Sequence, residues 1–556
     1  MTASGLANRA WQAACRPADA AFQRALLDPD AAQERVLAAH LRATADTAVG
    51  RRFGFGQIRT LAEFQARVPL LSWDDHAADM ARIEAGEAGV WTRAPVRLLE
   101  PTGGTTGGTR LVPYTRPMQG QIQTAVAVWM ADLFRAVPAL RDGPAYWSVS
   151  PAGARRAPTA GGVPVGFDSD AALLSPLHAR LARAVMAAPE ALRLVERAEA
   201  HRYATLLHLV ARADLALVSV WNPTFLSVLV APLRAWSGRL ARDLADGTLA
   251  CGLDAGLARR LAPRADARRA AELLTAVRDE PTDAGLHARL WPRLALVSAW
   301  ADGHAAVPFR VLRALFPHAA FQPKGLMATE GVVSIPLAGH DGVGHGGAAL
   351  ALTSHLVELV DGDRAVPPAE ARVGDLFEVA LTTGGGLVRT RLGDRIRVVG
   401  HAGRCPLVQF VGRVGPVSDR VGEKLHDAHV STCLAELPLP HRFALVACDD
   451  AAQPPAYVLF AETDASDEAL RAAVVSLDAG LGTNPGYAHA RRLGQLGPAR
   501  AFRIRGSGAE AFLAGCAALG QRAGDVKPAT LHRDGGWAGR FAGAFVDAPR
   551  RQSTPS

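Results

Sequence analysis

The chain has 556 residues, of which 49% are hydrophobic and 21% charged, with a formal net charge of +8. This composition supports a large apolar core and excludes a disordered chain, and the length corresponds to about three or four domain-sized units, or fewer larger ones. The arginines are scattered and no basic tract interleaves with aromatic residues, so we expect no nucleic-acid partner.

Lysine is nearly absent: only Lys324, Lys424 and Lys527 are lysines among 61 basic residues. A coding bias toward arginine explains this on a surface that needs only positive charge. Arginine is a poor substitute where a compact, flexible ammonium must reach a phosphate or a reacting oxygen. The three lysines are therefore candidates for function.

The first 19 residues lack a continuous apolar core, so we expect no secretory signal. The most membrane-like stretch, 215–233, contains Asn222-Pro223 and Pro232, and a buried strand followed by a helix explains it better than a membrane span. The six cysteines lie far apart without a C-x-x-C pair, which is typical of reduced core thiols. We therefore expect a cytoplasmic protein without membrane insertion.

In chain order, residues 7–86 have helical periodicity, and short apolar runs broken by glycine and proline follow from Val96. Two runs nearly repeat: Leu-Ala-Leu-Val-Ser-Val-Trp at 215–221 and Leu-Ala-Leu-Val-Ser-Ala-Trp at 294–300. Both are predicted to be buried strands that lead to helices. After the first, Asn222 is the predicted helix N-cap and Pro223 the first helical residue.

Residues 370–420 alternate strand-like runs with glycine turns, which predicts an antiparallel β unit. Its predicted strands are 375–382, 386–391, 394–399 and 407–411. A smaller α/β section follows, with predicted strands at 443–448, 456–461 and 501–505 and a helix at 467–479. The predicted fold class is α/β, with a boundary near 417–422 that separates a large domain, 1–417, from a smaller one, 418–556.

Four glycines and four threonines fall between Thr102 and Thr109. Backbone N–H groups of such a loop approach phosphates closely, and hydroxyl groups add donors. The loop is not a Walker A sequence, because Thr109-Arg110 stands where Lys-[Ser/Thr] is required. A surface linker is the alternative, but the apolar flanks at 98–99 and 111–112 argue against it.

Two acidic residues stand in turns that suit a nucleotide. Glu330, in Lys324-Gly-Leu-Met-Ala-Thr-Glu-Gly331, has the setting of a Mg²⁺ ligand, although taken alone an ordinary loop carboxylate is the favoured interpretation. Asp394 follows Gly393 at a predicted strand start and suits the two hydroxyls of a ribose. A turn aspartate paired with a neighbouring arginine is its alternative.

Glycines 412, 415 and 422 straddle the predicted boundary and have the composition of a hinge or of an ordinary glycine-rich turn. Arg413 and Lys424 flank this stretch, in reach of a nucleotide from either side. Lys527 precedes Pro528, so its backbone is predicted to be extended. A lysine on a loop of a mobile domain can be delivered into a distant site, and a solvated surface lysine is the alternative.

The ordered series of these motifs resembles the adenylate-forming superfamily, and more closely the plant auxin-responsive family of acyl-acid amido synthetases and its bacterial relatives. The resemblance covers nearly the whole chain and includes Arg391-Leu-Gly-Asp-Arg395, Val411-Gly-Arg413 and Gly422-Glu-Lys-Leu425. It implies a large N-terminal domain and a small mobile C-terminal domain that use ATP with Mg²⁺. A carboxylic acid would form acyl-AMP with release of pyrophosphate, and an amine, typically an amino acid, would then displace AMP to form an amide.

The resemblance also assigns roles to individual residues. Thr105, Thr106 and Gly107 match the phosphate loop, Thr329 the adenine-side motif, Glu330 the Mg²⁺ ligand, Asp394 the ribose-binding aspartate and Arg413 its neighbour. Lys424 lies in the hinge motif, and Lys527 resembles the lysine that supports adenylation. Trp300 and His304 fall where the acyl pocket is expected, and core packing is their alternative. Arg110 departs from the family, which carries lysine there.

Two rival functions share these observations. An acyl-CoA ligase uses the same adenylation step and ends in a thioester. A nucleotide-binding protein that has lost catalysis is suggested by Arg110. The sequence indicates neither the particular acid and amine nor the oligomeric state.

Overall fold

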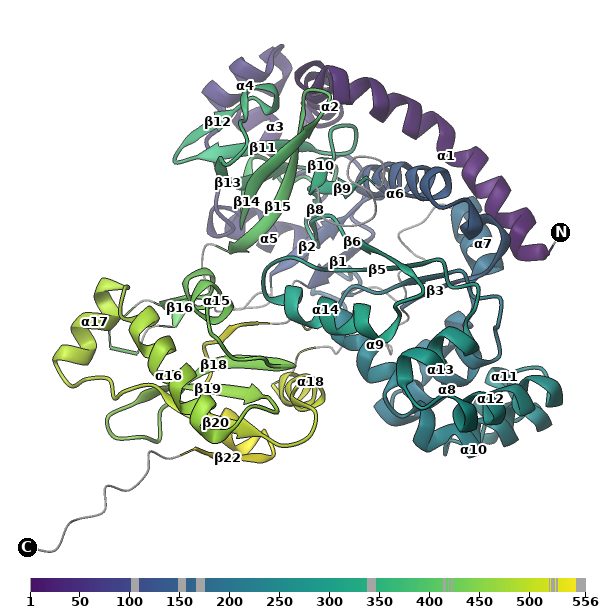
Figure 1. Ribbon diagram of the computed structural model, residues 1–556. Helices are drawn as coiled ribbons and strands as arrows, with labels where there is room; N and C mark the ends of the chain where they lie inside the picture. Colours follow the sequence, from purple (N-terminus) through teal and green to yellow (C-terminus); the bar gives the residue numbers. More distant parts are fainter. Residues whose placement is uncertain are drawn as a thin grey trace, which may run out of the picture. The chain divides into compact units, whose positions relative to one another are not determined.

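The computed structural model describes residues 2–101, 110–148, 157–166, 176–337, 347–413, 417–418, 420–421, 423, 425–519, 521, 526 and 529–546 (Figure 1). By its internal contacts the chain forms two compact units. The first contains residues 1–300 and 312–411, and the second contains 301–311 and 412–556. The expected mixed α/β class is confirmed.

The first unit opens with helices, as the periodicity predicts. They are α1 (Ala3–Leu27), α2 (Pro29–Thr44), α3 (Ala48–Arg52), α4 (Leu61–Arg67) and α5 (Ala77–Glu84). Local capping sets their starts: Thr2 accepts a hydrogen bond from the Gly5 N–H, and Asp28 accepts one from Ala31. Among the described residues, no helix is both long and apolar enough to cross a bilayer.

A four-stranded parallel sheet has the order β3-β4-β5-β6. Its strands are β3 (Ala145–Trp147), β4 (Leu217–Ser219), β5 (Leu296–Ala299) and β6 (Ala320–Pro323). The two near-repeats are thus neighbouring buried strands, as expected. Helices connect them: α7 (Pro176–Val185), α8 (Ala198–Val210), α9 (Pro223–Val230), α10 (Leu233–Asp246), α11 (Ala255–Leu261), α12 (Ala267–Asp279), α13 (Asp283–Leu290) and α14 (Ala306–Leu315). Asn222 caps α9 and accepts from the Thr224 N–H at 2.9 Å, which confirms the predicted cap.

A seven-stranded sheet has the order β12-β11-β13-β14-β15-β10-β9, and every strand pair described in it is antiparallel. Its strands are β9 (Ser334–Pro336), β10 (Ala348–Leu350), β11 (Leu356–Asp361), β12 (Arg364–Val366), β13 (Leu376–Thr382), β14 (Thr390–Ala402) and β15 (Cys405–Arg413). The antiparallel unit is confirmed, but two predicted strands, 386–391 and 394–399, are one strand that begins only at Thr390. Gly386 has φ of 100° and lies against Trp91, where a Cβ would come within 2.3 Å, so it forms a turn.

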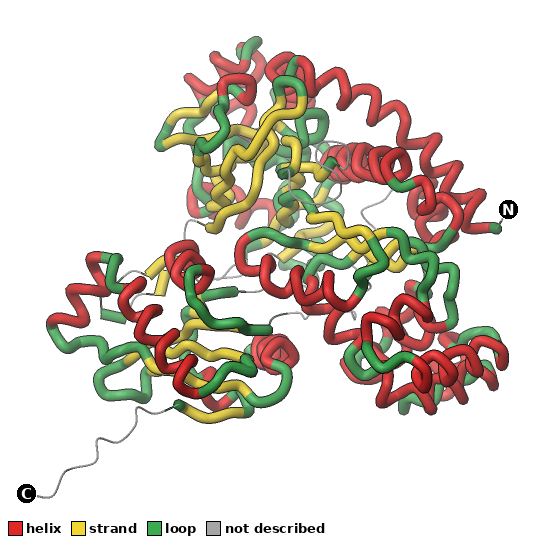
Figure 2. Tube along the Cα trace, viewed as in Figure 1, coloured by secondary structure: helices red, strands yellow, loops and turns green. Residues whose placement is uncertain are grey.

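The second unit is a five-stranded sheet of order β21-β18-β19-β20-β22, with helices on both faces (Figure 2). Its strands are β18 (Phe443–Asp449), β19 (Ala456–Glu462), β20 (Arg500–Ile504), β21 (Leu531–His532) and β22 (Gly543–Phe545). Side chains alternate between the two faces along each strand, so each face has its own core. Val446 and Leu459 face α15 (Asp427–Ala435), α16 (Asp467–Leu481) and α17 (Pro485–Arg492). Leu445 and Val458 face α18 (Gly508–Ala518). The predicted strands and the helix at 467–479 are confirmed.

All six cysteines are buried and unpaired, as expected. Burial raises the pKa of Cys405 to about 12, so this thiol stays protonated at neutral pH.

Candidate functional site

The glycine-threonine loop is flanked by two paired strands, β1 (Leu98–Pro101) and β2 (Leu111–Tyr114). Leu99 and Val112, one on each strand, are fully buried. Paired, buried flanks are those of a hairpin, and a loose surface linker lacks them. Thr105, Thr106 and Gly107 themselves lie outside the described residues.

Hydrogen bonds tie the exit of this hairpin to two other predicted motifs. The Tyr114 hydroxyl donates to the Thr329 carbonyl oxygen at 2.8 Å. Thr115 caps α6 (Arg116–Ala136) and donates through its own hydroxyl to the Gly384 carbonyl oxygen at 2.7 Å. On α6, the Gln121 side-chain oxygen accepts from the Gly384 N–H at 2.7 Å. The structure therefore brings together the end of the loop, the Thr-Glu turn and the segment that leads into β14.

Arg110 is half-buried, and its guanidinium lies 5.8 Å from the centre of the Trp73 ring. A planar guanidinium stacks on an indole better than an ammonium does. Trp73 also contacts His76, whose Nε2 is 2.8 Å from the Thr390 hydroxyl at the start of β14. Arg110, which stands where the resemblance implies lysine, thus has an aromatic partner.

Thr329 and Glu330 form the turn between β7 (Met327–Ala328) and β8 (Gly331–Val332), and Glu330 is only 7% exposed. A Cβ at Gly331 would lie 3.0 Å from His355 Nε2, so the turn approaches His355 closely. Burial lowers the pKa of His355 to about 3, which keeps the imidazole neutral. Its Nδ1 is 3.0 Å from the Gln121 side-chain oxygen, an acceptor, so the proton sits on Nδ1.

Asp394 is 4% exposed and lies inside β14, so the prediction that it begins a strand is wrong. The ladder explains its position: Glu378 pairs with Arg395, but Ala380 pairs with Arg391, so β14 carries extra residues at this point. Gly393, at φ of 76°, supplies the backbone conformation of the bulge. Bulges re-aim side chains, and here the bulge sets the direction of Asp394.

Sequence reasoning missed the residues that hold the start of β14. Arg389 has φ of 42°, a strained conformation for a residue with a Cβ. Its guanidinium Nε lies 3.0 and 3.1 Å from the two Glu358 carboxylate oxygens, and both side chains are buried. A second guanidinium nitrogen donates to the Gln65 carbonyl oxygen at 3.0 Å. Arg389 lies two residues before the Arg391–Arg395 motif, but nothing in the sequence signals Glu358, which lies on another strand.

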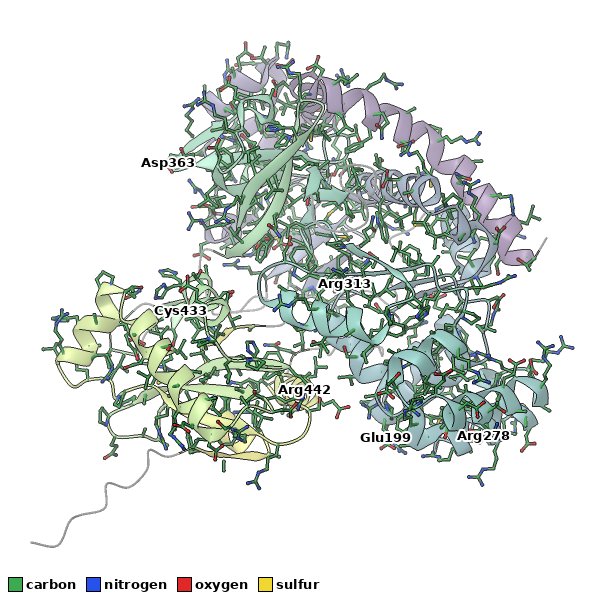
Figure 3. All side chains as sticks on the ribbon, viewed as in Figure 1. Glu199, Arg278, Arg313, Asp363, Cys433 and Arg442 are labelled. Carbon is green, nitrogen blue, oxygen red and sulfur yellow. The ribbon has the colours of Figure 1, made fainter. Side chains whose placement is uncertain are left out.

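The neighbouring Arg391 bonds outward, to Glu378 at 2.6 Å and to Asp363 at 2.8 Å in the turn after β11 (Figure 3). These contacts pair the Arg391 guanidinium with two carboxylates, of which Asp363 is exposed. Arg389, in contrast, is buried and holds the start of β14 through its pair with Glu358.

Trp300 follows β5 and is half-buried, with its ring 5.6 Å from that of Phe410. His304 lies in the 3-10 helix Gly303–Ala305 and its side chain lies outside the described residues. The packing of Trp300 is compatible with both interpretations given above, a pocket wall and a core residue.

Lys424, Lys527 and the side chain of Arg413 also lie outside the described residues. Beside Lys424, however, the Glu423 carboxylate is fully buried and accepts from the backbone N–H groups of Arg420 and Val421. The Tyr457 hydroxyl donates to it at 2.6 Å, and burial with this contact raises the pKa of Tyr457. A buried carboxylate therefore fixes the short hairpin β16 (Val417–Ser418) and β17 (Leu425–His426) that carries the predicted hinge motif.

Two models of known protein families match this chain. Residues 19–321 match the model described as the GH3 family N-terminal domain, and residues 352–413 match the GH3 family central domain. The first match alone covers more than half of the chain. The protein belongs to the GH3 family.

Individual relatives agree. The chain is 33% identical over 175 residues to a human GH3 domain-containing protein, covering 30% of this chain and 32% of the relative. The match to the corresponding mouse protein covers 42% of that relative, so the matched stretches span less than half of these two proteins. The chain is 24% identical over 441 residues to the Arabidopsis thaliana indole-3-acetic acid-amido synthetase GH3.2, covering 72% of this chain and 77% of the relative.

A solved structure confirms the fold. The structure of AtGH3.15 acyl acid amido synthetase in complex with 2,4-DB superposes with a TM-score of 0.80 at 18% identity, covering 94% of each chain.

Proposed function

We propose that the protein is an ATP-dependent acyl-acid amido synthetase. The observation that carries the proposal is the set of hydrogen bonds that joins Tyr114, Thr115 and Gln121 to Thr329 and Gly384. These bonds join the β1–β2 hairpin to the turn that carries Glu330 and to the segment that leads into β14, and we place the phosphate, metal and ribose motifs of an adenylating enzyme on these three segments. The amido synthetases among the relatives support the amide product.

In the first half-reaction, a carboxylate oxygen of the acid attacks the α-phosphate of ATP. The bond between the α- and β-phosphates breaks, and pyrophosphate leaves with acyl-AMP formed. An amine, which we expect to be an amino acid, then attacks the acyl carbon, AMP leaves, and the amine proton is lost to solvent. Negative charge builds on the phosphoryl oxygens in the first step, so donors aimed there in advance lower the barrier.

Glu330 would supply a carboxylate oxygen to a Mg²⁺ ion that substrate phosphates also bind. Mg²⁺ in nucleotide sites is bound by one or two carboxylates together with substrate phosphates. Glu330 is a buried carboxylate on a turn tied to the β1–β2 hairpin through Tyr114 and Thr329. When bound, the metal neutralises phosphate charge.

We assign the remaining roles by the family resemblance. Thr105, Thr106, Gly107 and Arg110 would bind phosphates, Thr329 the adenine, and Asp394 and Arg413 the ribose. Lys424 would act in the hinge and Lys527 would support adenylation. Trp300 and His304 would line the acid pocket. We also propose a mobile C-terminal domain, with 1–417 and 418–556 as the functional division, in a cytoplasmic protein of bacterial type.

One assay tests the function. The purified chain is incubated with ATP, Mg²⁺ and a panel of carboxylic acids, and pyrophosphate release is measured. Amino acids or coenzyme A are then added and the product is identified by mass. An acyl amide is expected. A thioester would support the acyl-CoA ligase instead, and no pyrophosphate release with any acid would support a nucleotide-binding protein without catalysis.

A further inference from the structure

The two near-repeated segments occupy adjacent strands in matching register. Ser219 on β4 pairs with Ser298 on β5, and the same row continues to Trp147 on β3 and Gln322 on β6. Residues paired across a sheet point to the same face. One face of the parallel sheet therefore carries a row of polar or indole side chains at the carboxyl ends of its four strands.

A second row lies two residues further along each chain segment, on the same face. It contains Trp221, Trp300 and Lys324. Backbone bonds extend the ladder to these positions: the Trp300 N–H donates to the Trp221 carbonyl oxygen at 2.9 Å, and the Lys324 N–H donates to Ala299 at 3.0 Å. Open parallel sheets bind ligands beyond the carboxyl ends of their strands. The repeat thus supplies matched serines and tryptophans at that edge.

Lys324 is the charged member of these rows and is only 7% exposed. Its Nζ donates to the Ser219 hydroxyl at 2.8 Å and lies 4.6 and 4.8 Å from the ring centres of Trp129 and Trp221. In the described part of the chain, no carboxylate pairs with it. Burial lowers the pKa of Lys324 to about 7, whereas the two indole faces favour the ammonium.

Besides the Trp147 indole N–H, two polar groups of the first row have no hydrogen-bond partner among the described residues. The Ser298 hydroxyl is fully buried and has no hydrogen-bond partner among the described residues, and the same holds for the side-chain nitrogen of Gln322. The Gln322 oxygen accepts from the Trp129 indole at 2.8 Å, which leaves that nitrogen as the unused end. Buried polar groups are normally paired, so this row offers hydroxyl and amide donors beside an ammonium that uses one of its three N–H groups on Ser219.

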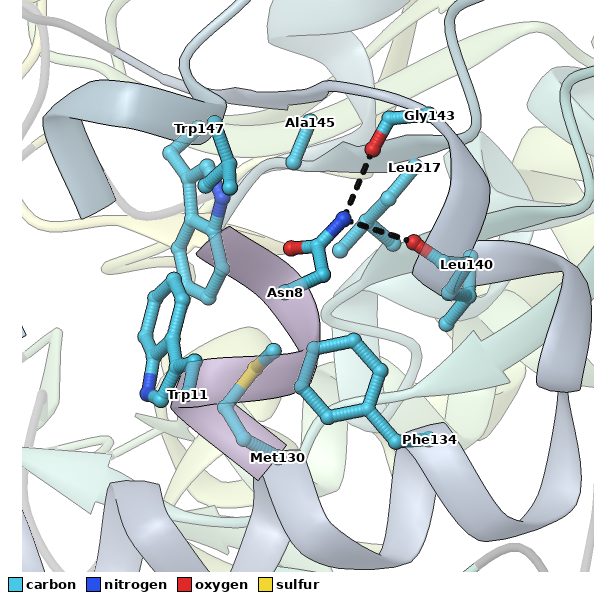
Figure 4. Close-up of a pocket in the computed structure, with 10 residues that line it drawn as sticks. Asn8, Trp11, Met130, Phe134, Leu140, Gly143, Ala145, Trp147 and Leu217 are labelled. Atoms are coloured by element: carbon cyan, nitrogen blue, oxygen red, sulfur yellow. Dashed lines mark hydrogen bonds between the residues drawn. The ribbon is translucent and has the colours of Figure 1, made fainter. Parts of the chain in front are cut away.

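The edge with Lys324 is more suitable for a ligand than the apolar cavity on the same face. Trp221, which covers one side of Lys324, is 43% exposed. The cavity lies toward the other ends of the strands and is lined by Trp11, Met130, Phe134 and Leu217 (Figure 4). Its polar residue, Asn8, already donates to the Leu140 and Gly143 carbonyl oxygens at 3.0 and 2.9 Å. The other donor in its lining, the Trp147 indole N–H, is uncharged, so among the described residues this cavity offers no cation for a carboxylate.

We propose that Lys324 binds a carboxylate of the acid substrate within these rows and is a specificity-determining residue of the acid subsite. The inference rests on the proposed function for the identity of its ligand. A carboxylate here accepts from the ammonium and lies within the same rows as the unused donors of Ser298 and Gln322, while the indoles of Trp129, Trp221 and Trp300 pack against a flat acyl group. The carboxylate is either the reacting group of a monoacid or the second group of a diacid.

Acid binding without ATP tests this directly. Isothermal titration calorimetry compares benzoate, phenylacetate, indole-3-acetate and terephthalate with their primary amides, using the full chain. We expect at least one carboxylate to bind more tightly than its amide. Lys324→Met should weaken the binding of that carboxylate about 10- to 100-fold, because hydrogen bonds to charged groups are lost. The affinity for the corresponding amide should change by less than about 3-fold. If Lys324→Met weakens the binding of monoacids, Lys324 binds the reacting carboxylate. If it weakens only the binding of terephthalate, Lys324 binds the second carboxylate of a diacid.

Matched variants control for charge and folding. Arg313→Met removes one positive charge from the exposed surface of α14 and should leave binding unchanged (Figure 3). Ser219→Ala removes the hydroxyl that accepts from Lys324, and it should weaken carboxylate binding less than Lys324→Met does. If the methionine variant does not fold, Ser219→Ala and Lys324→Gln test the proposal in its place.

Unchanged carboxylate affinity in the Lys324 variants, or no carboxylate preference over the amide in the native chain, would overturn the proposal. The two proposals fail separately. If acids bind in a way that depends on Lys324 but no pyrophosphate is released, only the proposed function is contradicted. If pyrophosphate is released and the KM for the acid is unchanged in Lys324→Met, only the proposed acid subsite is contradicted.

Discussion

Arg110 stands where the family resemblance implies lysine, and the structure gives this arginine a physical setting. The guanidinium lies over Trp73, and Trp73 leads through His76 to the start of β14. Lysine at this position keeps the charge but loses the planar group that stacks on the indole. The arginine is therefore interpreted as a compensated substitution.

Arg110→Lys is expected to lower kcat/KM for ATP in adenylation by roughly 3- to 10-fold, because a cation–π contact of about 1 kcal/mol is weakened. Pyrophosphate release at varied ATP concentration measures the effect. In a Trp73→Leu background the same change should have little further effect. Arg116→Lys, at an exposed position on α6, is the control. A large gain in rate from Arg110→Lys would instead show that arginine is a handicap.

Tyr114 provides a second test at the scale of one residue. Its hydroxyl connects the β1–β2 hairpin to the turn that carries Glu330. Tyr114→Phe leaves the Thr329 carbonyl oxygen without this donor, which costs about 1 kcal/mol and should lower the adenylation rate roughly 5-fold. Tyr203→Phe is the matched control, because it removes a comparable bond to Asp243 in the helical region. Equal effects of both variants on adenylation would contradict a specific role for Tyr114.

At the scale of elements, the sequence predicts what depends on local pattern. The strands of the near-repeats, the Asn222 cap and the antiparallel unit follow from periodicity and turn residues, and all are present. The bulge at Gly393 and Asp394 was not predicted, because a bulge is defined by the partner strand. The Arg389–Glu358 pair and the Tyr114–Thr329 bond join residues far apart in sequence, so neither composition nor motif spacing predicts them.

The Arg389–Glu358 pair is expected to stabilise the start of β14. Glu358→Gln removes the charge of one partner and leaves a buried guanidinium unneutralised, which should cost about 3–5 kcal/mol of the free energy of unfolding. Asp142→Asn, which breaks the exposed pair with Arg9, should cost less than about 1 kcal/mol. Urea unfolding of both variants measures the difference. A Glu358→Gln cost as small as that of the control would show that the pair is not an anchor.

At the scale of the whole molecule, three buried histidines in the first unit couple its stability to pH. Burial lowers the pKa of His40 and of His76 to about 4, and that of His355 to about 3. All three are neutral in the folded chain, but they take up protons in the unfolded chain below about pH 6.5. Because the unfolded state then binds more protons, stability must fall as the pH falls from 6.5 toward 4.

The expected loss by pH 5 is about 2 kcal/mol for each of these histidines, or roughly 6 kcal/mol in total, relative to pH 7. Urea unfolding at pH 7, 6 and 5 measures it. His76→Asn keeps a side-chain group able to bond Thr390 and removes one titrating site, so it should lose about 2 kcal/mol less than the native chain over the same range. Equal losses in the two proteins would mean that His76 titrates alike in both states, and that burial of its ring does not exclude the proton.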